Sequence, residues 1–213
     1  AEGDDRDLVS HDTLRSAAGE LRAVEAVREC NTAGCRLHFC HMSTTASVTA
    51  AAAAGSVEVT PHHLFLSHEQ FKPDDTYGKV NPPLRSEKER RALWTIWEKI
   101  GVIASDHAPH TSAEKQVPFR GAPSGIPGVE TMVPLLLAAV LAKKVSLPDV
   151  IRKTSQAPAE LLGMTPAGFS PADRGDFALF PKEAVRIDPD TLHSKCGFSP
   201  FAGLPAVFPQ MVI

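Results

Sequence analysis

Short apolar runs that end in polar clusters alternate along this chain with longer segments of helical periodicity. The run at residues 102–105 is too short for a helix and rich in β-branched residues, so it predicts a buried strand. Residues 36–42 and 56–60 predict two further strands, and residues 79–83 leave room for only a very short one before their prolines. The pattern therefore predicts strands that each end in polar residues.

Helical periodicity fills most of the intervening sequence. Apolar residues spaced three and four apart from Leu14 onward predict a helix of about five turns that ends near Gly34, after a polar loop over residues 1–12. Capping residues, alanine-rich or apolar composition and a capping box predict the other helices. These lie at residues 46–54, 86–100 and 129–143, with one or two more at 147–163.

The order of these elements predicts an α/β fold with parallel strands. We count four strand–loop–helix units, whereas a closed (β/α)8 barrel of the TIM type takes roughly 250 residues. The sequence thus predicts half of such a barrel over residues 1–164. The proline-rich tail, residues 165–213, has one strand-like run at 176–180 and predicts part of a small β subdomain.

Composition narrows the class of protein. With 43% hydrophobic residues and a net charge of −3, the 213 residues can form a sizeable core and offer no basic surface for nucleic acid or anionic membranes. No apolar run approaches the roughly 20 residues of a membrane span. Four cysteines without a CxxC pair indicate reduced thiols and a cytoplasmic location. Because the chain opens at Ala1 without Met, we expect a partial chain.

Three candidate metal ligands follow three different strands. His41, His62 and Asp106 each stand where a predicted strand ends, and the carboxyl ends of parallel strands meet at one rim. A single histidine in such a place is more often structural. Two imidazoles and a carboxylate at one rim suit a zinc-type cation and leave a coordination position for water.

Five motifs together resemble those of one enzyme family. The chain is similar, from about residue 1 to residue 203, to dihydroorotases of the amidohydrolase superfamily, and it matches the second half of that family's barrel. The resemblance implies the last four strand–helix units. The matching segments are His41-Met42-Ser43-Thr44, Thr60-Pro61-His62-His63-Leu64, Val80-Asn81-Pro82-Pro83-Leu84-Arg85, Ser105-Asp106-His107-Ala108-Pro109-His110 and Gly125-Ile126-Pro127-Gly128-Val129-Glu130.

The resemblance implies roles for individual residues. His41 and His62 match two histidines that hold one zinc ion, while Asp106 matches the ligand of a second ion that also acts as catalytic base. Asn81 and His110 match residues that contact the substrate.

The resemblance also implies differences from the family. Ser124 and Gly125 stand where the family usually has a Phe-Gly pair that meets the substrate through its backbone, so Ser124 is a departure. The family's His-x-His, its substrate-binding arginine and its bridging metal ligand have no counterpart in these residues. A complete site with two zinc ions therefore needs groups from outside this sequence.

The implied reaction is the reversible cyclisation of N-carbamoyl-L-aspartate to dihydroorotate in pyrimidine biosynthesis. The expected partners are this small-molecule substrate and either a second copy of the chain or another pyrimidine-pathway enzyme. Two alternatives remain open. One is a related cyclic-amide hydrolase of the hydantoinase or allantoinase type, and the other is a non-catalytic scaffold protein.

Other conspicuous residues have structural explanations. We expect His63 and His107 to pack or hydrogen-bond beside the site rather than bind metal. Cys35 and Cys40 bracket a strand, and buried cysteines usually act as small hydrophobic residues.

Overall fold

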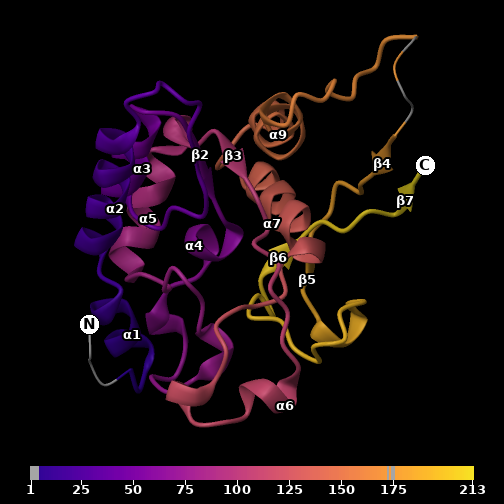
Figure 1. The fold of residues 1–213 in the computed structure, drawn as a ribbon. Helices are drawn as coiled ribbons and strands as arrows, with labels where there is room; N and C mark the ends of the chain where they lie inside the picture. The colour runs from indigo at the N-terminus through magenta and orange to yellow at the C-terminus, as the bar shows by residue number, and fades with distance from the viewer. Residues whose placement is uncertain (1–4, 172, 174–175) are drawn as a thin grey trace.

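A three-stranded parallel sheet lies at the centre of the molecule, with the order β1-β2-β3. The computed structural model describes residues 5–171, 173 and 176–213. Past the end of β3, an isolated parallel bridge joins His107 to Ile126, just before helix α7. The strands are β1 (His38–Phe39), β2 (Ser56–Val59) and β3 (Val102–Ile103), as Figure 1 shows.

Helices pack around this sheet and account for most of the regular structure. A π-helical turn, Arg152–Gln156, joins the last two of them. In the described part of the chain the α-helices are α1 (Leu8–Leu14), α2 (Ala17–Cys30), α3 (Thr45–Ala52), α4 (Pro61–Phe65), α5 (Glu87–Thr95), α6 (Ser112–Lys115), α7 (Val129–Leu141), α8 (Leu147–Ile151) and α9 (Ala157–Leu161).

The two faces of the sheet have opposite character. Val57 and Val59 are at most 1% exposed and belong to the main core, which also holds apolar side chains of α2, α3, α5, α7 and α8. Each such burial contributes roughly 1.5–3 kcal/mol. The alternate side chains, Ser56 and Glu58, are only partly buried on the other face. Open parallel sheets carry helices on both faces, whereas in a closed barrel the helices cover only the outer face of the sheet. The sheet therefore has the construction of a barrel segment whose polar face is the inner one.

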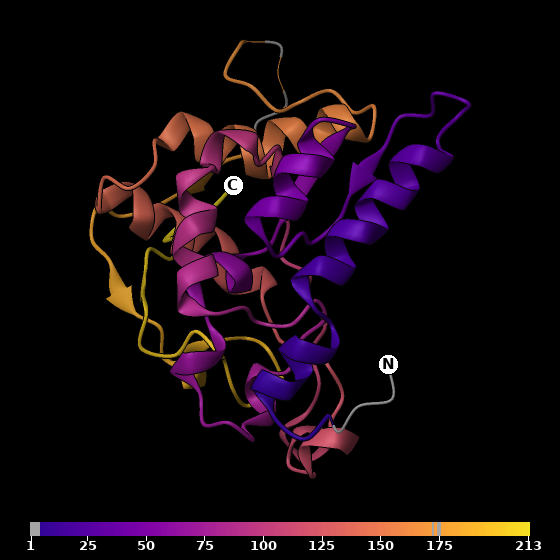
Figure 2. The same ribbon diagram turned by 90° about the vertical axis from the view of Figure 1, so that its left-hand side faces the viewer.

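The tail adds two small antiparallel pairs. Strand β4 (Ala178–Leu179) pairs with β7 (Met211–Val212), and β5 (Val185–Arg186) pairs with β6 (Pro205–Ala206). The tail is joined to α7 by a hydrogen bond of 2.9 Å from the Val207 N–H to the Pro134 carbonyl. Figures 1 and 2 show the N-terminal helices and this tail on opposite sides of the molecule. The predicted strand in the tail is confirmed, while a domain boundary at residue 164 stays a prediction.

One predicted helix is wrong in its extent. Helix α1 begins within the segment predicted as loop, because Asp7 and Ser10 form a reciprocal capping box at its start. The chain then breaks before Ala17, where the Ser16 side chain accepts the Gly19 N–H and begins α2. Two capped helices thus replace the single five-turn helix that apolar spacing predicted.

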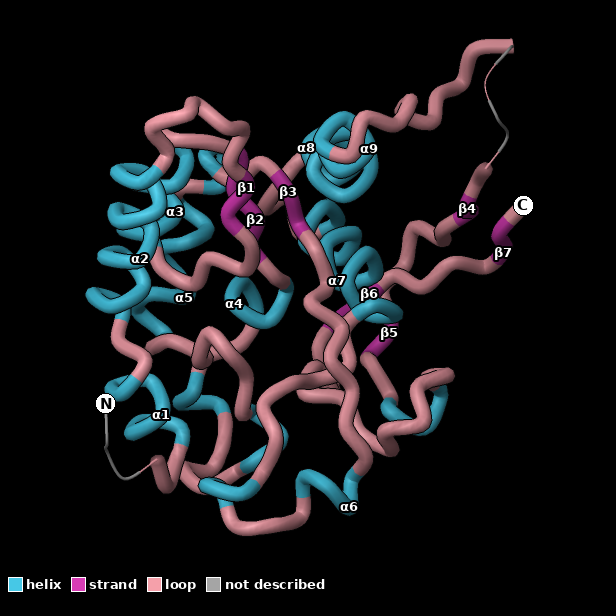
Figure 3. The backbone as a smooth tube through the Cα atoms, in the orientation of Figure 1, coloured by secondary structure: helices cyan, strands magenta, loops and turns pink. Residues whose placement is uncertain are grey.

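The predicted strand count is also corrected. Residues 79–83 form no strand, since Pro82 and Pro83 have no N–H to donate, and the connection from α4 to α5 is mostly loop (Figure 3). The first strand is limited to His38–Phe39 because His41 turns into the left-handed region. Three strands and one bridge therefore stand where four strands were expected.

The remaining predicted elements are confirmed within a few residues. Thr44 caps α3, and Ser86 caps α5 by accepting the Glu89 N–H. The Glu89 carboxylate, however, accepts the Thr45 N–H at 2.6 Å, so it caps α3 rather than its own helix. Among the described residues, no helix has the length and apolarity that a membrane crossing requires.

Candidate active site

The predicted metal ligands stand at the carboxyl ends of the central strands. His41 and Asp106 follow β1 and β3, and both have left-handed backbones, with φ values of 43° and 45°. His62 lies in the first turn of α4, directly after β2. Left-handed non-glycine residues are uncommon and are concentrated at functional sites. The conformation of these two residues thus marks this rim of the sheet.

The two imidazoles have free, buried nitrogens. The His41 N–H donates to Glu58 Oε1 at 3.1 Å, while His41 Nδ1 and His62 Nε2 are buried without a hydrogen-bond partner. Burial holds the pKa of His62 well below its ordinary value, and the neighbouring His63 and His41 lower it further. A neutral imidazole with an unpaired nitrogen is the form that binds a divalent metal ion. The donors present therefore fit such an ion.

Asp106 offers a half-buried carboxylate near His41. Burial raises the pKa of Asp106, Glu58 adds to the rise, and His41 opposes it. A carboxylate with a raised pKa is better suited to exchange a proton near neutral pH than an ordinary surface aspartate. Asp106 is thus a suitable candidate for an acid–base group.

His41 links the other two predicted ligands, since it influences the pKa values of both His62 and Asp106. The three donors are not all within 4.8 Å of one another. In the described part of the chain, the group that meets this distance is His38, Cys40 and Glu58. Coordination of metal by His41, His62 and Asp106 therefore stays a prediction.

The predicted substrate-contacting residues lie at two places. At the first, Asn81 lines a cavity of about 550 Å³ together with the predicted metal ligand His41. At the second, Gly125 lies beside His110. Gly125 packs against the loop that carries His110: a Cβ on Gly125 would lie 3.2 Å from His110 Cδ2 and 2.5 Å from the Ala108 carbonyl oxygen. With a φ of 135° this position requires glycine. Ser124 precedes it and is partly buried.

Two buried lysines, Lys79 and Lys115, connect the segment before Asn81 with the segment before Gly125. Their role was not recognised in the sequence. Lys79 Nζ donates to the carbonyls of Phe119 and Ala122 at 2.7 and 3.0 Å. Lys115 Nζ donates to the carbonyls of Lys79 and Pro123 at 3.2 and 2.9 Å. The Lys79 carbonyl also accepts the Gly125 N–H at 2.9 Å.

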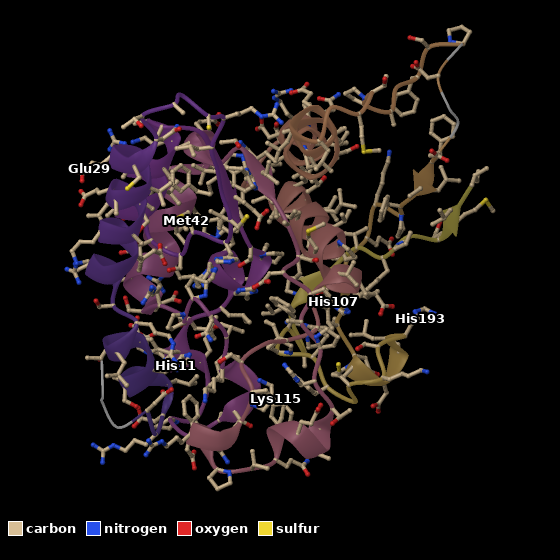
Figure 4. The ribbon with its side chains drawn as sticks, viewed as in Figure 1. His11, Glu29, Met42, His107, Lys115 and His193 are labelled. Carbon is tan, nitrogen blue, oxygen red and sulfur yellow. The ribbon has the colours of Figure 1, made fainter. Side chains whose placement is uncertain are left out.

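These bonds fix residues 118–125 beside Asn81. Lys115, labelled in Figure 4, is fully buried although lysine is normally a surface residue. A lysine at the end of a short polar segment gives no sequence signal of such a role.

Arg85 was also missed as a structural anchor. It is 5% exposed, and its guanidinium donates to Ser43 Oγ at 2.8 Å and pairs with Asp12 and Glu20. Glu20 in turn accepts the Ser43 N–H at 3.0 Å. This network joins the segment after His41 to helices α1 and α2, and so it supports the backbone on which His41 stands.

The structural roles expected for two neighbouring histidines are confirmed. His63 is hydrogen-bonded to Thr60 Oγ1 at 2.8 Å and to the Pro82 carbonyl at 3.2 Å. His107 Nδ1 accepts the N–H groups of Gly128 and Val129 at 3.0 and 3.3 Å, which caps α7. Figure 4 shows His107 where the chain approaches α7.

Solved structures establish the class of fold. L-hydantoinase from Arthrobacter aurescens matches with a TM-score of 0.91 and 24% identity, over 98% of this chain and 50% of that one. Dihydroorotase from Saccharomyces cerevisiae, in complex with 5-fluoroorotic acid, matches with a TM-score of 0.71 and 16% identity, over 92% and 57%. At such identities the likeness shows fold alone, and the chain has about half of the fold that these two enzymes share.

Sequence comparison then confirms the resemblance to dihydroorotase. The chain is 44% identical to "Dihydroorotase" of Halobacterium salinarum over 205 residues, which are 93% of this chain and 49% of that protein. It is 38% identical to "Dihydroorotase" of Methanosarcina acetivorans, over 95% and 48%. The chain thus spans about half the length of the curated relatives it matches. No protein-family model matches it.

Proposed function

We propose that these residues form part of a dihydroorotase, a metal-dependent enzyme that interconverts N-carbamoyl-L-aspartate and dihydroorotate. One observation carries the proposal: buried, unpaired nitrogens of His41 and His62 lie at the same rim as the half-buried carboxylate of Asp106. The identities of 35–44% to curated dihydroorotases support the choice of reaction.

The proposed roles of His41, His62 and Asp106 follow from the chemistry of amide hydrolysis. A bound divalent metal ion lowers the pKa of water toward neutrality and polarises a carbonyl group. His41 and His62 would hold one ion, and Asp106 would bind another. Asp106 accepts a proton from the attacking water and returns it to the ring nitrogen that departs, and the reverse sequence closes the ring. Zinc suits the imidazole ligands.

Substrate recognition would fall to residues at two places on the rim, namely Asn81, which lines a cavity with His41, and His110, which packs against Gly125. The substrate carries a carboxylate, and His110 and Asn81 offer polar contacts from two sides of the rim. Gly125, with Ser124 before it, offers backbone groups held in place by the lysine-anchored loop. This assignment distinguishes dihydroorotate from cyclic amides that carry no carboxylate.

The remaining parts of the proposal concern the complete protein. The other metal ligands and an arginine for the substrate carboxylate would come from the half of the enzyme that these residues do not contain. A homo-oligomer, or association with another enzyme of pyrimidine synthesis, would complete its assembly. The free thiols of Cys30, Cys35, Cys40 and Cys196 support a location in the cytoplasm.

A second candidate is a hydantoinase-type cyclic-amide hydrolase, which the TM-score of 0.91 to L-hydantoinase favours at the level of fold. Ring opening of dihydroorotate and of hydantoin by the natural full-length protein, with zinc supplied, separates the two. We expect dihydroorotate to be consumed at the higher kcat/KM. A higher kcat/KM for hydantoin would assign the second function, and activity on neither would support a scaffold role.

A further inference from the structure

A buried histidine of the first helix contacts the segment that carries Asn81. His11 lies in α1, is fully buried and is labelled in Figure 4. Its Nε2 lies 2.9 Å from the carbonyl oxygen of Val80, which is 69 residues away in the chain. Val80 is itself 2% exposed, and Asn81 follows it directly and lines the cavity shared with His41. The contact therefore joins α1 to a predicted substrate-contacting residue.

The partners of the imidazole ring determine where its proton lies. A carbonyl oxygen only accepts hydrogen bonds, so His11 Nε2 carries a proton and donates it to Val80. His11 Nδ1 faces the Asp5 carboxylate at 2.9 Å and the Arg15 guanidinium at 3.1 Å. Whether Nδ1 donates to the carboxylate or accepts from the guanidinium, the proton on Nε2 is retained. The hydrogen bond to Val80 is thus present in the neutral and in the charged ring.

Neighbouring side chains hold the ring of His11 in this orientation. Burial tends to raise the pKa of Asp5, but the hydrogen bond with His11 and the nearby cationic groups leave that pKa below its ordinary value. Asp5 is therefore a carboxylate near neutral pH, and Arg15 Nη1 lies 3.3 Å from it. The ring of Phe119 makes an edge-to-face contact with the imidazole, with centroids 5.8 Å apart. Three neighbours thus keep the ring directed at Val80.

The Val80 carbonyl affects the direction in which the Asn81 side chain leaves the backbone. This carbonyl belongs to the peptide plane that also contains the Asn81 nitrogen, and peptide planes are rigid. The preceding carbonyl, that of Lys79, accepts the Gly125 N–H at 2.9 Å. The hydrogen bond from His11 then holds the next carbonyl along the chain. Two successive carbonyls are therefore held by hydrogen bonds immediately before Asn81.

We propose that His11 is a positioning residue for substrate recognition, which holds the Val80–Asn81 peptide so that the Asn81 amide meets the substrate carboxylate. The inference rests on the function proposed above, in which Asn81 contacts N-carbamoyl-L-aspartate and dihydroorotate. Because His11 is fully buried, it acts through Asn81 rather than by touching the substrate. A displacement of about 1 Å in a group that orients a substrate can cost about 10²-fold.

A double-mutant cycle on the natural full-length protein tests this role. His11→Leu removes the donor, and we expect the KM for dihydroorotate to rise by about 10- to 100-fold with a smaller change in kcat. His11→Gln, whose amide nitrogen can take the position of Nε2, should keep KM near the wild-type value. In an Asn81→Ala background, His11→Leu should have no further effect on KM, because the side chain that His11 positions is gone.

A buried donor at the amino end of the sheet, opposite the rim, provides the control for lost stability. Lys153 donates to the carbonyl of Ile100, just before β3 begins. Lys153→Met leaves that carbonyl without its donor, so it should lower the midpoint of urea unfolding but leave KM unchanged. If His11→Leu does not fold, His11→Asn replaces it in the cycle, since its shorter amide stays near Asp5 and does not reach Val80.

Three results would overturn the inference while leaving the proposed function intact. They are an unchanged KM in His11→Leu, a KM for His11→Gln as high as that of His11→Leu, and an equal rise in KM with Asn81 present or replaced. Each would show that His11 only stabilises the fold. Absence of ring opening by the wild-type protein would instead refute the proposed function, and with it the role of Asn81 on which this inference rests.

Discussion

His41 and Asp106 have the same left-handed backbone conformation, although 65 residues separate them in the chain; their φ values differ by only 2°. They follow β1 and β3, the two strands that flank β2. Such a conformation costs on the order of 1–3 kcal/mol for each residue and persists only where surrounding contacts impose it. In His41 the Glu58 carboxylate supplies one of those contacts. We interpret the matched strain as the backbone signature of the candidate active site.

Replacing Asp106 with Asn should greatly reduce turnover in the full-length enzyme. The variant loses the proposed base and a charged metal ligand, so kcat should fall by at least about 10²–10⁴-fold, the range typical of general-base loss. Asp74→Asn, at an exposed position, is the control and should leave kcat unchanged. Steady-state ring-opening assays at saturating zinc measure kcat for both variants. A loss of less than tenfold would remove Asp106 from the catalytic role.

His110→Ala should act mainly on binding. If His110 holds the substrate carboxylate equally in the ground state and the transition state, its loss raises KM more than it lowers kcat. The same assay, run over a wide range of dihydroorotate concentration, separates the two constants. A fall in kcat with unaltered KM would show that His110 takes part in the chemical step instead.

Gly125→Ala should destabilise the loop that carries the substrate-contacting backbone. A Cβ there would lie 2.5 Å from the Ala108 carbonyl oxygen, at a φ of 135°. We expect a loss of about 3 kcal/mol or more in the free energy of unfolding, from strain and overpacking together. Gly34→Ala is the matched control: its φ is also positive, but a Cβ would meet nothing within 4 Å, so about 1 kcal/mol should be lost. Equal losses in urea titrations would contradict the proposed close packing.

Lys115 should make stability depend on pH above neutrality. Burial, with Lys79 nearby, lowers the pKa of Lys115 to about 8 in the folded protein, against an ordinary value of 10.5. Below pH 8 both states are protonated, and the cost of burying the ammonium is fully present. Between about pH 8 and 10.5 the unfolded state binds more protons, so stability rises with pH. The destabilisation caused by Lys115→Met should therefore be larger at pH 9.5 than at pH 7.5. A penalty independent of pH would show that Lys115 keeps its ordinary pKa.

The 213 residues expressed alone should not open the dihydroorotate ring. In the part of the chain that the structure describes, the central sheet has two unpaired edges and a polar face without opposing strands, and the proposed site has only some of the metal ligands that the reaction needs. Adding a separately expressed segment that covers the rest of the barrel should restore measurable loss of dihydroorotate absorbance. Turnover by the lone chain near that of a complete enzyme would mean that these residues form a full site by themselves.

The strand-end positions of His41 and Asp106 could be predicted because short strand-like runs, residues 36–40 and 102–105, end directly before them. The helix caps at Thr44 and Ser86 were equally visible, since capping depends on local residue types. Local pattern could not reveal the break between α1 and α2, which depends on competition between two caps within an otherwise continuous apolar spacing.

Long-range contacts explain the other omissions. Lys79 and Lys115 bond to carbonyls that lie up to 43 residues away in the chain, and no periodicity reports such a partnership. The proximity of His38, Cys40 and Glu58 depends on the register between β1 and β2. Register decides which side chains lie next to one another across the sheet, and it cannot be predicted from the sequence of either strand alone.

The Lys79 carbonyl, which accepts both Lys115 Nζ and the Gly125 N–H, has a consequence for the mobility of the loop at residues 118–125. The Lys79 carbonyl holds the loop at Gly125, the Lys79 ammonium holds it at the carbonyls of Phe119 and Ala122, and Lys115 Nζ holds it at the Pro123 carbonyl. A loop held in this way does not swing open as a lid. Residues 118–125 therefore form a fixed wall, and we expect any motion that admits a ligand to this rim to lie in another segment.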